Sequence, residues 1–485
     1  MSKRLSIVSV LLIHLALRLH NLTIQVPHID EGFHVSRALL VWHFEQNPGR
    51  FMHGKLLLYY WVGLFDPQPM SGLWVARASI AIFSIITAAT LYQIGRTLSN
   101  HWGGLLTVSL YAVMPYAIFF ERMAMADPLA AGFAALVGWR SLVFARHPSY
   151  RQGAILGVLI ALASMSKLTM APVALVPVFA TIGHVNWRRR ILPPLIVAAC
   201  IVIVAWMPIM LPAAYAHLYG DPFRLVSENN LQQLDSASPI DELQRLYPQI
   251  ADLSGHLFWV GLVLVVGMAL WCGYHRARIG WLLAWIGAVV LFSLLFSNRP
   301  RPRYFMPAIG PTVVLVAVAC TYLWRMPPLR VLVRSTMIAG LAVWSLTFAL
   351  PFIQALTTDP LRLNLSPYET QLYLVGTQSG PAIEQAVRLI ESQDPRPSII
   401  YTNWGTCQSL YFYTTLDIGC LESANSPVEV LQHPVTYIIR NGDERGEFNR
   451  YGVEWVRLGI FERQGGLFTV EVWRATTPSH QQAQP

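Results

Sequence analysis

Charged residues are scarce in this chain of 485 residues: Asp, Glu, Lys and Arg make up 13% of the sequence, whereas hydrophobic residues make up 54%. A soluble domain typically carries about 25% charged residues. The shortage excludes an ordinary soluble protein and indicates a polytopic membrane protein. The net charge of +9 does not indicate nucleic-acid binding, because the positive residues fall mostly in short loops between apolar segments, where membrane topology explains them.

Cysteine is also rare, with five in the chain, and neither a C-x-x-C motif nor a Cys/His metal spacing is present. Three of the five, Cys200, Cys272 and Cys320, lie in or beside apolar segments and are interpreted as packing residues. The other two, Cys407 and Cys420, lie in the polar C-terminal part. In an oxidising compartment these two could form a disulfide, and the sequence leaves that pairing open.

Long apolar segments are abundant instead. About eleven are long enough to cross, or nearly cross, roughly 30 Å of hydrocarbon. No small-x-small cleavage site follows the first segment, which favours an uncleaved span over a signal peptide. The pair at 152–184 is short and interrupted by proline, so one broken span with a re-entrant piece is an alternative there. The segments lie at 5–22, 72–95, 103–120, 128–145, 152–168, 170–184, 191–211, 255–273, 279–297, 304–324 and 331–352.

The basic residues predict the orientation of these spans. With Lys3 and Arg4 in the cytoplasm, every alternate loop is basic, for example "WRRR" at 187–190. An odd number of spans then leaves the C-terminus outside the cell membrane. We therefore expect a multi-pass module over residues 1–352, with a long first external loop at 23–71, and an extracytoplasmic domain over 353–485.

The C-terminal part has the pattern of a small α/β domain. Residues 379–393, "SGPAIEQAVRLIESQ", have apolar side chains at helical spacing. Four segments, "PSIIYTNW", "VTYIIRN", "GVEWVRLGIF" and "LFTVEVWRA", are typical of strands. The predicted fold class is thus a polytopic α-helical membrane protein of about eleven spans with an external C-terminal α/β domain.

Ionisable residues are predicted to gather on the outer face, where such residues near the membrane indicate function. Arginine suits a phosphate ligand because its planar fork donates two hydrogen bonds, although arginines there could instead anchor lipid headgroups. An acid before proline could simply cap a helix, as Asp127 before Pro128 could. The candidates are Asp30, Glu31, His53, Lys55, Arg122, Asp127, Lys167, Arg301 and Arg303.

Acids beside a cationic cluster suit a reaction between a lipid-linked phosphate and an external nucleophile. A carboxylate would take the proton from an acceptor hydroxyl, a contribution of roughly 10²–10⁴ in rate. The arginines would hold the phosphate and stabilise the charge that develops as it leaves.

Four motifs carry a resemblance to a known family. "DEGFHVSRAL" at 30–39, "KLLLYYW" at 55–61, "ADPL" at 126–129 and "RYFMPAIGP" at 303–311 resemble the GT-C superfamily of integral-membrane glycosyltransferases. The branch that they resemble contains the family 39 protein O-mannosyltransferases and the aminoarabinose transferases. The resemblance covers residues 1–350 and agrees with the predicted spans.

The resemblance implies roles for individual residues. Asp30 matches the catalytic aspartate, Glu31 its partner and Asp127 the second acid. Lys55 matches the lysine of the following loop, and "RY" at 303–304 matches the entry to a late span near the donor phosphate, which implicates Tyr304 together with the arginines. No cofactor is certain. A divalent cation, if one binds, would be held by Asp30 and Asp127.

The expected function is that of an inverting, mannosyltransferase-like hexosyltransferase. It would move a sugar from an undecaprenyl- or dolichyl-phosphate donor to a hydroxyl of a protein or glycolipid acceptor. A transporter or flippase of a lipid-linked precursor is the alternative, and it predicts ionisable residues deep within spans and internal repeats. A structural membrane protein would leave the paired acids and the outer arginines without a role.

Overall fold

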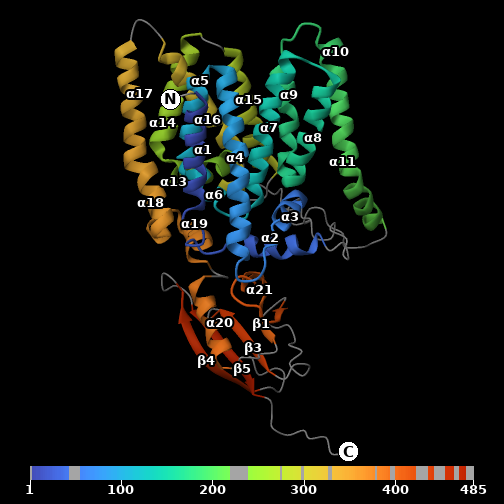
Figure 1. Cartoon of the computed structure of the whole chain (residues 1–485), viewed down its shortest axis with the longest axis vertical. Coiled ribbons are helices and arrows are strands. Elements are labelled where there is room, and N and C mark those ends of the chain that lie inside the picture. The colour runs from blue at the N-terminus through green and yellow to red at the C-terminus, as the bar shows by residue number, and fades with distance from the viewer. Residues whose placement is uncertain are drawn as a thin grey trace, which may run out of the picture.

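The computed structural model describes residues 3–42, 55–218, 239–273, 276–296, 300–325, 330–376, 380–393, 399–421, 435–441, 454–463 and 469–476. It consists of a bundle of long helices with a small sheet domain at one end (Figure 1).

The helices follow the apolar segments of the sequence closely. Through the first half of the bundle they are α1 (Lys3–Leu19), α2 (Ile29–Leu40), α3 (Leu56–Gly63), α4 (Gly72–Leu98), α5 (His101–Ala112), α6 (Pro115–Glu121), α7 (Ala126–Arg146), α8 (Tyr150–Ser166), η2 (Leu168–Leu175), α9 (Val176–Thr181), α10 (Trp187–Arg190) and α11 (Leu192–Leu218). The second half contains α13 (Pro239–Ser254), α14 (His256–Trp271), α15 (Arg276–Phe296), η3 (Pro302–Phe305), α16 (Met306–Leu323), α17 (Arg330–Trp344), η4 (Ser345–Ala349), α18 (Leu350–Thr358), η5 (Pro360–Arg362), α19 (Pro367–Thr370) and η6 (Gln371–Val375).

Each of the eleven predicted spans contains a helix or a run of consecutive helices. By length and composition alone, five helices within the described ranges are able to cross a membrane, or seven if two bent pairs each count as one span. The α5–α6 pair bends by 60° and the α13–α14 pair by 100°. The multi-helical architecture is therefore confirmed, while the number of eleven crossings stays a prediction.

The two ends of the bundle differ in character. The amphipathic helix α2, the short α3 and the sheet domain lie at one end (Figure 1). The N-terminus and α10, with its run of three arginines, lie at the other. This separation agrees with the alternation of basic loops in the sequence, and which end faces the cytoplasm stays a prediction.

The sheet domain has five strands in the described residues, in the order β2-β1-β3-β5-β4. The strand β1 is parallel to β2 and β3, whereas β5 is antiparallel to β3 and β4. The apolar face of α20 (Pro381–Gln393) packs on the sheet. The four expected strands are present, and the four-residue β2 is an addition that the sequence pattern did not reveal. The strands are β1 (Ile399–Asn403), β2 (Ile418–Leu421), β3 (Thr436–Asn441), β4 (Glu454–Glu462) and β5 (Thr469–Thr476).

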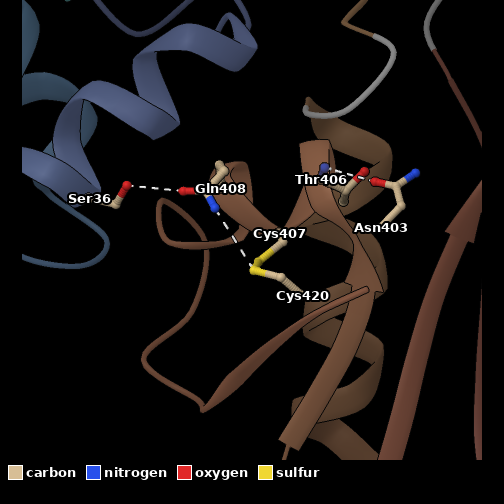
Figure 2. The surroundings of a disulfide bond; sticks show 6 residues. All are labelled: Ser36, Asn403, Thr406, Cys407, Gln408 and Cys420. Carbon is tan, nitrogen blue, oxygen red and sulfur yellow. Dashed lines mark hydrogen bonds between the residues drawn. A yellow bond between two sulfur atoms is a disulfide. The ribbon is translucent and has the colours of Figure 1, made fainter. Parts of the chain in front are cut away.

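The sheet domain contacts the helical bundle through α21 (Trp404–Leu410), which packs against α2. The Ser36 hydroxyl of α2 donates a hydrogen bond to Gln408 Oε1 at 3.0 Å, and a disulfide joins the neighbouring Cys407 to Cys420 of β2 (Figure 2). Gly32 allows this close approach, because a Cβ atom there would lie 2.3 Å from the carbonyl oxygen of Gln408. Helix α2 is thus held from the side of the sheet domain.

Candidate active site

The sequence "HIDE" at 28–31 forms the capping box of α2. His28 Nδ1 accepts a hydrogen bond from the Asp30 backbone N–H at 3.0 Å, and Glu31 Oε2 accepts one from the His28 N–H at 2.8 Å. The arrangement satisfies N–H groups that lack a helical partner, and it places both acids where the helix dipole stabilises negative charge.

Glu31 is fully buried and its hydrogen bonds are saturated within the protein. Arg77 Nε lies 2.8 Å from Oε1 and Arg77 Nη2 lies 2.7 Å from Oε2. The Ala124 N–H donates to Oε1 at 2.8 Å, in addition to the bond from His28. Each carboxylate oxygen therefore accepts two hydrogen bonds, and this placement favours a positioning role for Glu31 over the catalytic role expected from the sequence.

Asp30 lies in a different environment. Its Oδ2 is 2.7 Å from Arg303 Nη2 and 3.9 Å from Lys55 Nζ, and its side chain is 24% exposed. Within the described residues no hydrogen bond or ion pair uses Oδ1. Burial acts to raise the pKa of Asp30, but the positive charges of Arg303 and Lys55 outweigh it and hold the pKa well below its usual value. The carboxylate is therefore ionised, with one oxygen open to a ligand.

Lys55 is oriented by a histidine that the sequence did not single out. Lys55 Nζ lies 3.1 Å from His34 Nε2, and His34 Nδ1 lies 2.6 Å from the carbonyl oxygen of Ala124. Burial holds the pKa of His34 well below its usual value, so the ring is neutral. Since Nδ1 must donate to the carbonyl, Nε2 accepts from Lys55. The ammonium group is thereby directed toward the Asp30 carboxylate.

The two arginines of "RPRY" have different environments. Arg303 is buried and paired with Asp30. Arg301 is half-buried, its guanidinium lies 5.6 Å from the centre of the Tyr368 ring, and it makes no ion pair with the residues that the structure describes. Arg301 is therefore the cation with a free fork for an anionic ligand.

Asp127 lies beside a second lysine. It is in the first turn of α7, but the N-cap residue is Met125, whose side chain makes no capping hydrogen bond. The carboxylate is instead ion-paired with Lys167, which ends α8. Lys167 Nζ also lies 3.7 Å from the centre of the Tyr304 ring, a cation–π contact. The capping interpretation of Asp127 is thus wrong, because Met125 is the N-cap residue and the Asp127 carboxylate is paired with Lys167.

Arg122 does not join the cluster. The Nη atoms of Arg122 donate hydrogen bonds to backbone carbonyl oxygens that follow α1, among them those of His20 at 2.6 Å and Asn21 at 2.8 Å. Arg122 therefore has a structural role. His53 lies outside the described residues. Nor do the described residues contain a group of three His, Cys, Asp or Glu that could hold a metal ion. Asp30 and Asp127, which would hold a divalent cation if one binds, are paired with the side chains of Arg303 and Lys167.

The cluster thus combines cations with two acids at the end of the bundle that carries the sheet domain. Such a site can bind a phosphate group beside an ionised carboxylate. Sequence reasoning missed Arg77 and His34, as well as Glu369 and Tyr373 near Arg303. A lone arginine in the apolar segment 72–95 was a visible signal for Arg77.

Comparison with known proteins agrees with this fold. Residues 57–211 match the family model of dolichyl-phosphate-mannose-protein mannosyltransferase. The structure resembles ArnT from Cupriavidus metallidurans bound to undecaprenyl phosphate, with 15% identity, 96% of this chain and 97% of that chain covered, and a TM-score of 0.59. It also resembles the archaeal oligosaccharyltransferase AglB from Archaeoglobus fulgidus in complex with an inhibitory peptide and a dolichol-phosphate, with 12% identity, 90% and 69% covered, and a TM-score of 0.57. No curated protein sequence matches the chain.

Proposed function

We propose that this chain, which has the fold of the GT-C integral-membrane glycosyltransferases, transfers a sugar from a polyprenyl-phosphate donor to an acceptor hydroxyl. The observation that carries the proposal is the ionised Asp30, which has one oxygen held by Arg303 and the other open. The polyprenyl phosphates bound by ArnT and AglB support a donor of the same chemistry.

The donor phosphate would bind to Arg301, Arg303 and Lys55. Arg301 offers a bidentate fork, and each charge-assisted hydrogen bond contributes about 1.5–3 kcal/mol. The polyprenyl chain would lie against the apolar helices of the bundle, so that the sugar is presented at the end where α2 lies.

The proposed reaction is a transfer with inversion at the anomeric carbon. The acceptor oxygen attacks the anomeric carbon opposite the phosphate, the bond from that carbon to the phosphate oxygen breaks, and polyprenyl phosphate leaves with both bond electrons. Asp30 Oδ1 takes the proton of the acceptor hydroxyl. Arg303 and Lys55 lower the pKa of Asp30 in the free protein, so a bound phosphate that shares these cations raises that pKa and makes Asp30 a better base.

The finer assignments extend this proposal. Asp127 and Lys167 orient Tyr304 beside the donor, and Glu31 keeps the first turn of α2 in place. The sugar is a hexose such as mannose, and the acceptor is a protein or a glycolipid. The site and the domain over 353–485 face the outside of the plasma or inner membrane, and the catalytic module spans 1–352.

Lipid extracts test the proposal whichever sugar the donor carries. Cells that lack the chain should accumulate a polyprenyl-phosphate sugar, and wild-type chain should remove it. Asp30→Asn should fail to do so because transfer falls by roughly 10²–10⁴. The purified variant should bind undecaprenyl phosphate at least as tightly as wild type, because no carboxylate competes for Arg303.

The control is Asp359→Asn, which removes an exposed acid paired with Arg362. It should restore normal lipid levels. If cells without the chain accumulate no such lipid, the proposed function is wrong. If Asp30→Asn restores normal levels, Asp30 is not the base.

A further inference from the structure

Buried polar atoms without a hydrogen-bond partner gather beside Asp30 and Arg303. An unsatisfied buried polar group costs about 1–3 kcal/mol, so native proteins contain few, and a group of them in one place indicates a missing polar ligand or water. In the part of the chain that the structure describes, these atoms are Gln25 Oε1, His28 Nε2, Arg303 Nε, Glu369 Oε1 and Oε2, and Tyr373 Oη.

The contacts among these residues place them together. The His28 ring stacks on the Tyr373 ring with a centroid distance of 5.0 Å. Gln25 Nε2 donates a hydrogen bond to the carbonyl oxygen of Tyr373 at 3.3 Å. Glu369 lies in α19, which leads directly into the η6 turn that carries Tyr373. The four residues therefore come from two segments, the one before α2 and the one at 366–375, that lie against each other.

The hydrogen-bonding capacity of the group is mixed. His28 Nδ1 accepts from the Asp30 N–H, and burial lowers the pKa of His28 to about 3, so Nε2 carries the only ring proton and donates. Arg303 Nε also donates. Glu369 and Gln25 offer acceptor oxygens, and the Tyr373 hydroxyl does both.

This mixture selects the class of ligand. A phosphate accepts hydrogen bonds only, and the Glu369 carboxylate would repel it. A hydrocarbon chain would leave every one of these atoms unsatisfied. Sugar hydroxyl groups both donate and accept, and two neighbouring hydroxyls can donate to the two oxygens of one carboxylate.

We propose that Glu369, Tyr373, Gln25 and His28 form the subsite that binds the hydroxyl groups of the sugar on the lipid-linked donor. The inference rests on the proposed function. Arg303 connects the two sites, because its Nη2 is at the phosphate-binding cluster and its Nε belongs to the unsatisfied group. A sugar attached to a phosphate at Arg303 therefore lies next to this subsite.

Burial affects the protonation of Glu369. Burial raises the pKa of Glu369 to about 7, although the charges of Arg301, Arg303 and Arg245 act to lower it. Hydrogen bonds from sugar hydroxyls stabilise the carboxylate form, so bound sugar would lower this pKa.

Binding measurements on purified full-length protein in nanodiscs separate sugar from phosphate. The probes are undecaprenyl phosphate and undecaprenyl-phosphate mannose. Wild type should bind the mannose lipid more tightly than the bare lipid. Glu369→Ala should weaken binding of the mannose lipid by about 10–100-fold, the loss of one to two hydrogen bonds to a charged group. The bare lipid should bind at least as tightly as to wild type, because an acid that repels the phosphate is removed. The control Glu384→Ala removes an exposed acid paired with Arg388 and should change neither affinity.

A second variant covers the case in which Glu369→Ala does not fold. Tyr373→Phe removes a hydroxyl that has no hydrogen-bond partner in the described residues, so the variant should fold. It should weaken the affinity for the mannose lipid by about 3–10-fold and leave the affinity for the bare lipid unchanged. Equal affinities of wild type for the two lipids, or equal weakening of both by the variants, would overturn the sugar subsite. If wild type binds neither lipid, the proposed function itself fails.

Discussion

The buried pair of Glu31 and Arg77 allows a test that separates positioning from chemistry. Glu31→Gln keeps the size of the side chain but removes its charge. The Arg77 guanidinium then stays fully buried without a counter-charge. The NH2 group of the new glutamine also faces N–H donors, with which it cannot form hydrogen bonds. Breaking one half of a buried pair costs about 3–5 kcal/mol. We therefore expect Glu31→Gln to be strongly destabilised.

The assay is thermal unfolding of the detergent-solubilised protein, with transfer measured on the same preparation. A loss of 3–5 kcal/mol corresponds to a drop in Tm of roughly 5–10 °C for a large chain. The exposed control Glu384→Gln should keep the Tm of wild type.

If Glu31→Gln melts with wild-type protein while its transfer rate falls by about 10²-fold or more, a magnitude typical of a lost acid or base, Glu31 acts in the chemistry. The sequence-based expectation for Glu31 would then be right and the positioning role wrong.

The remaining predictions concern the phosphate site and the contact with the sheet domain. Arg301→Ala should weaken undecaprenyl-phosphate binding by about 10-fold. It should not lower the Tm, because Arg301 has no ion pair in the described ranges to lose. A lowered Tm would indicate that Arg301 has a structural role instead. Gly32→Ala should push α2 away from Gln408 and lower kcat by up to about 10²-fold, since a displacement of about 1 Å has effects of this size, with little change in KM. Gly261→Ala, where a Cβ would meet nothing within 4 Å, is the control, and a wild-type kcat for Gly32→Ala would show that this contact does not matter.

Most of the architecture could be predicted because it depends on local pattern. Runs of apolar residues long enough for the bilayer became helices, and alternating segments after residue 397 became strands. The proximity of Asp30 and Arg303 followed from the parity of the basic loops, which put both on one face, and the structure brings them to 2.7 Å.

The details of the site depend on packing between distant segments, which a single sequence does not encode by spacing. Glu31 looked like a second catalytic acid because the adjacency of two carboxylates is visible, whereas the approach of Arg77 from α4 is not. Asp127 before a proline has the local pattern of a cap, and only the position of Lys167 at the end of α8 decides against it. Glu369 belongs to none of the motifs assigned to the site, and only its burial without a side-chain hydrogen-bond partner in the described residues reveals it.

The hydrogen bond between Ser36 and Gln408 joins residues 372 positions apart, and this separation has a consequence for biosynthesis. Helix α2 leaves the ribosome among the first segments of the chain, yet the surface that holds it is among the last to be made. Asp30, in the first turn of α2, is therefore synthesised well before the sheet domain that packs against its helix. Because domains fold in turn during synthesis, we expect α2 to reach its final position only after the sheet domain has folded and docked.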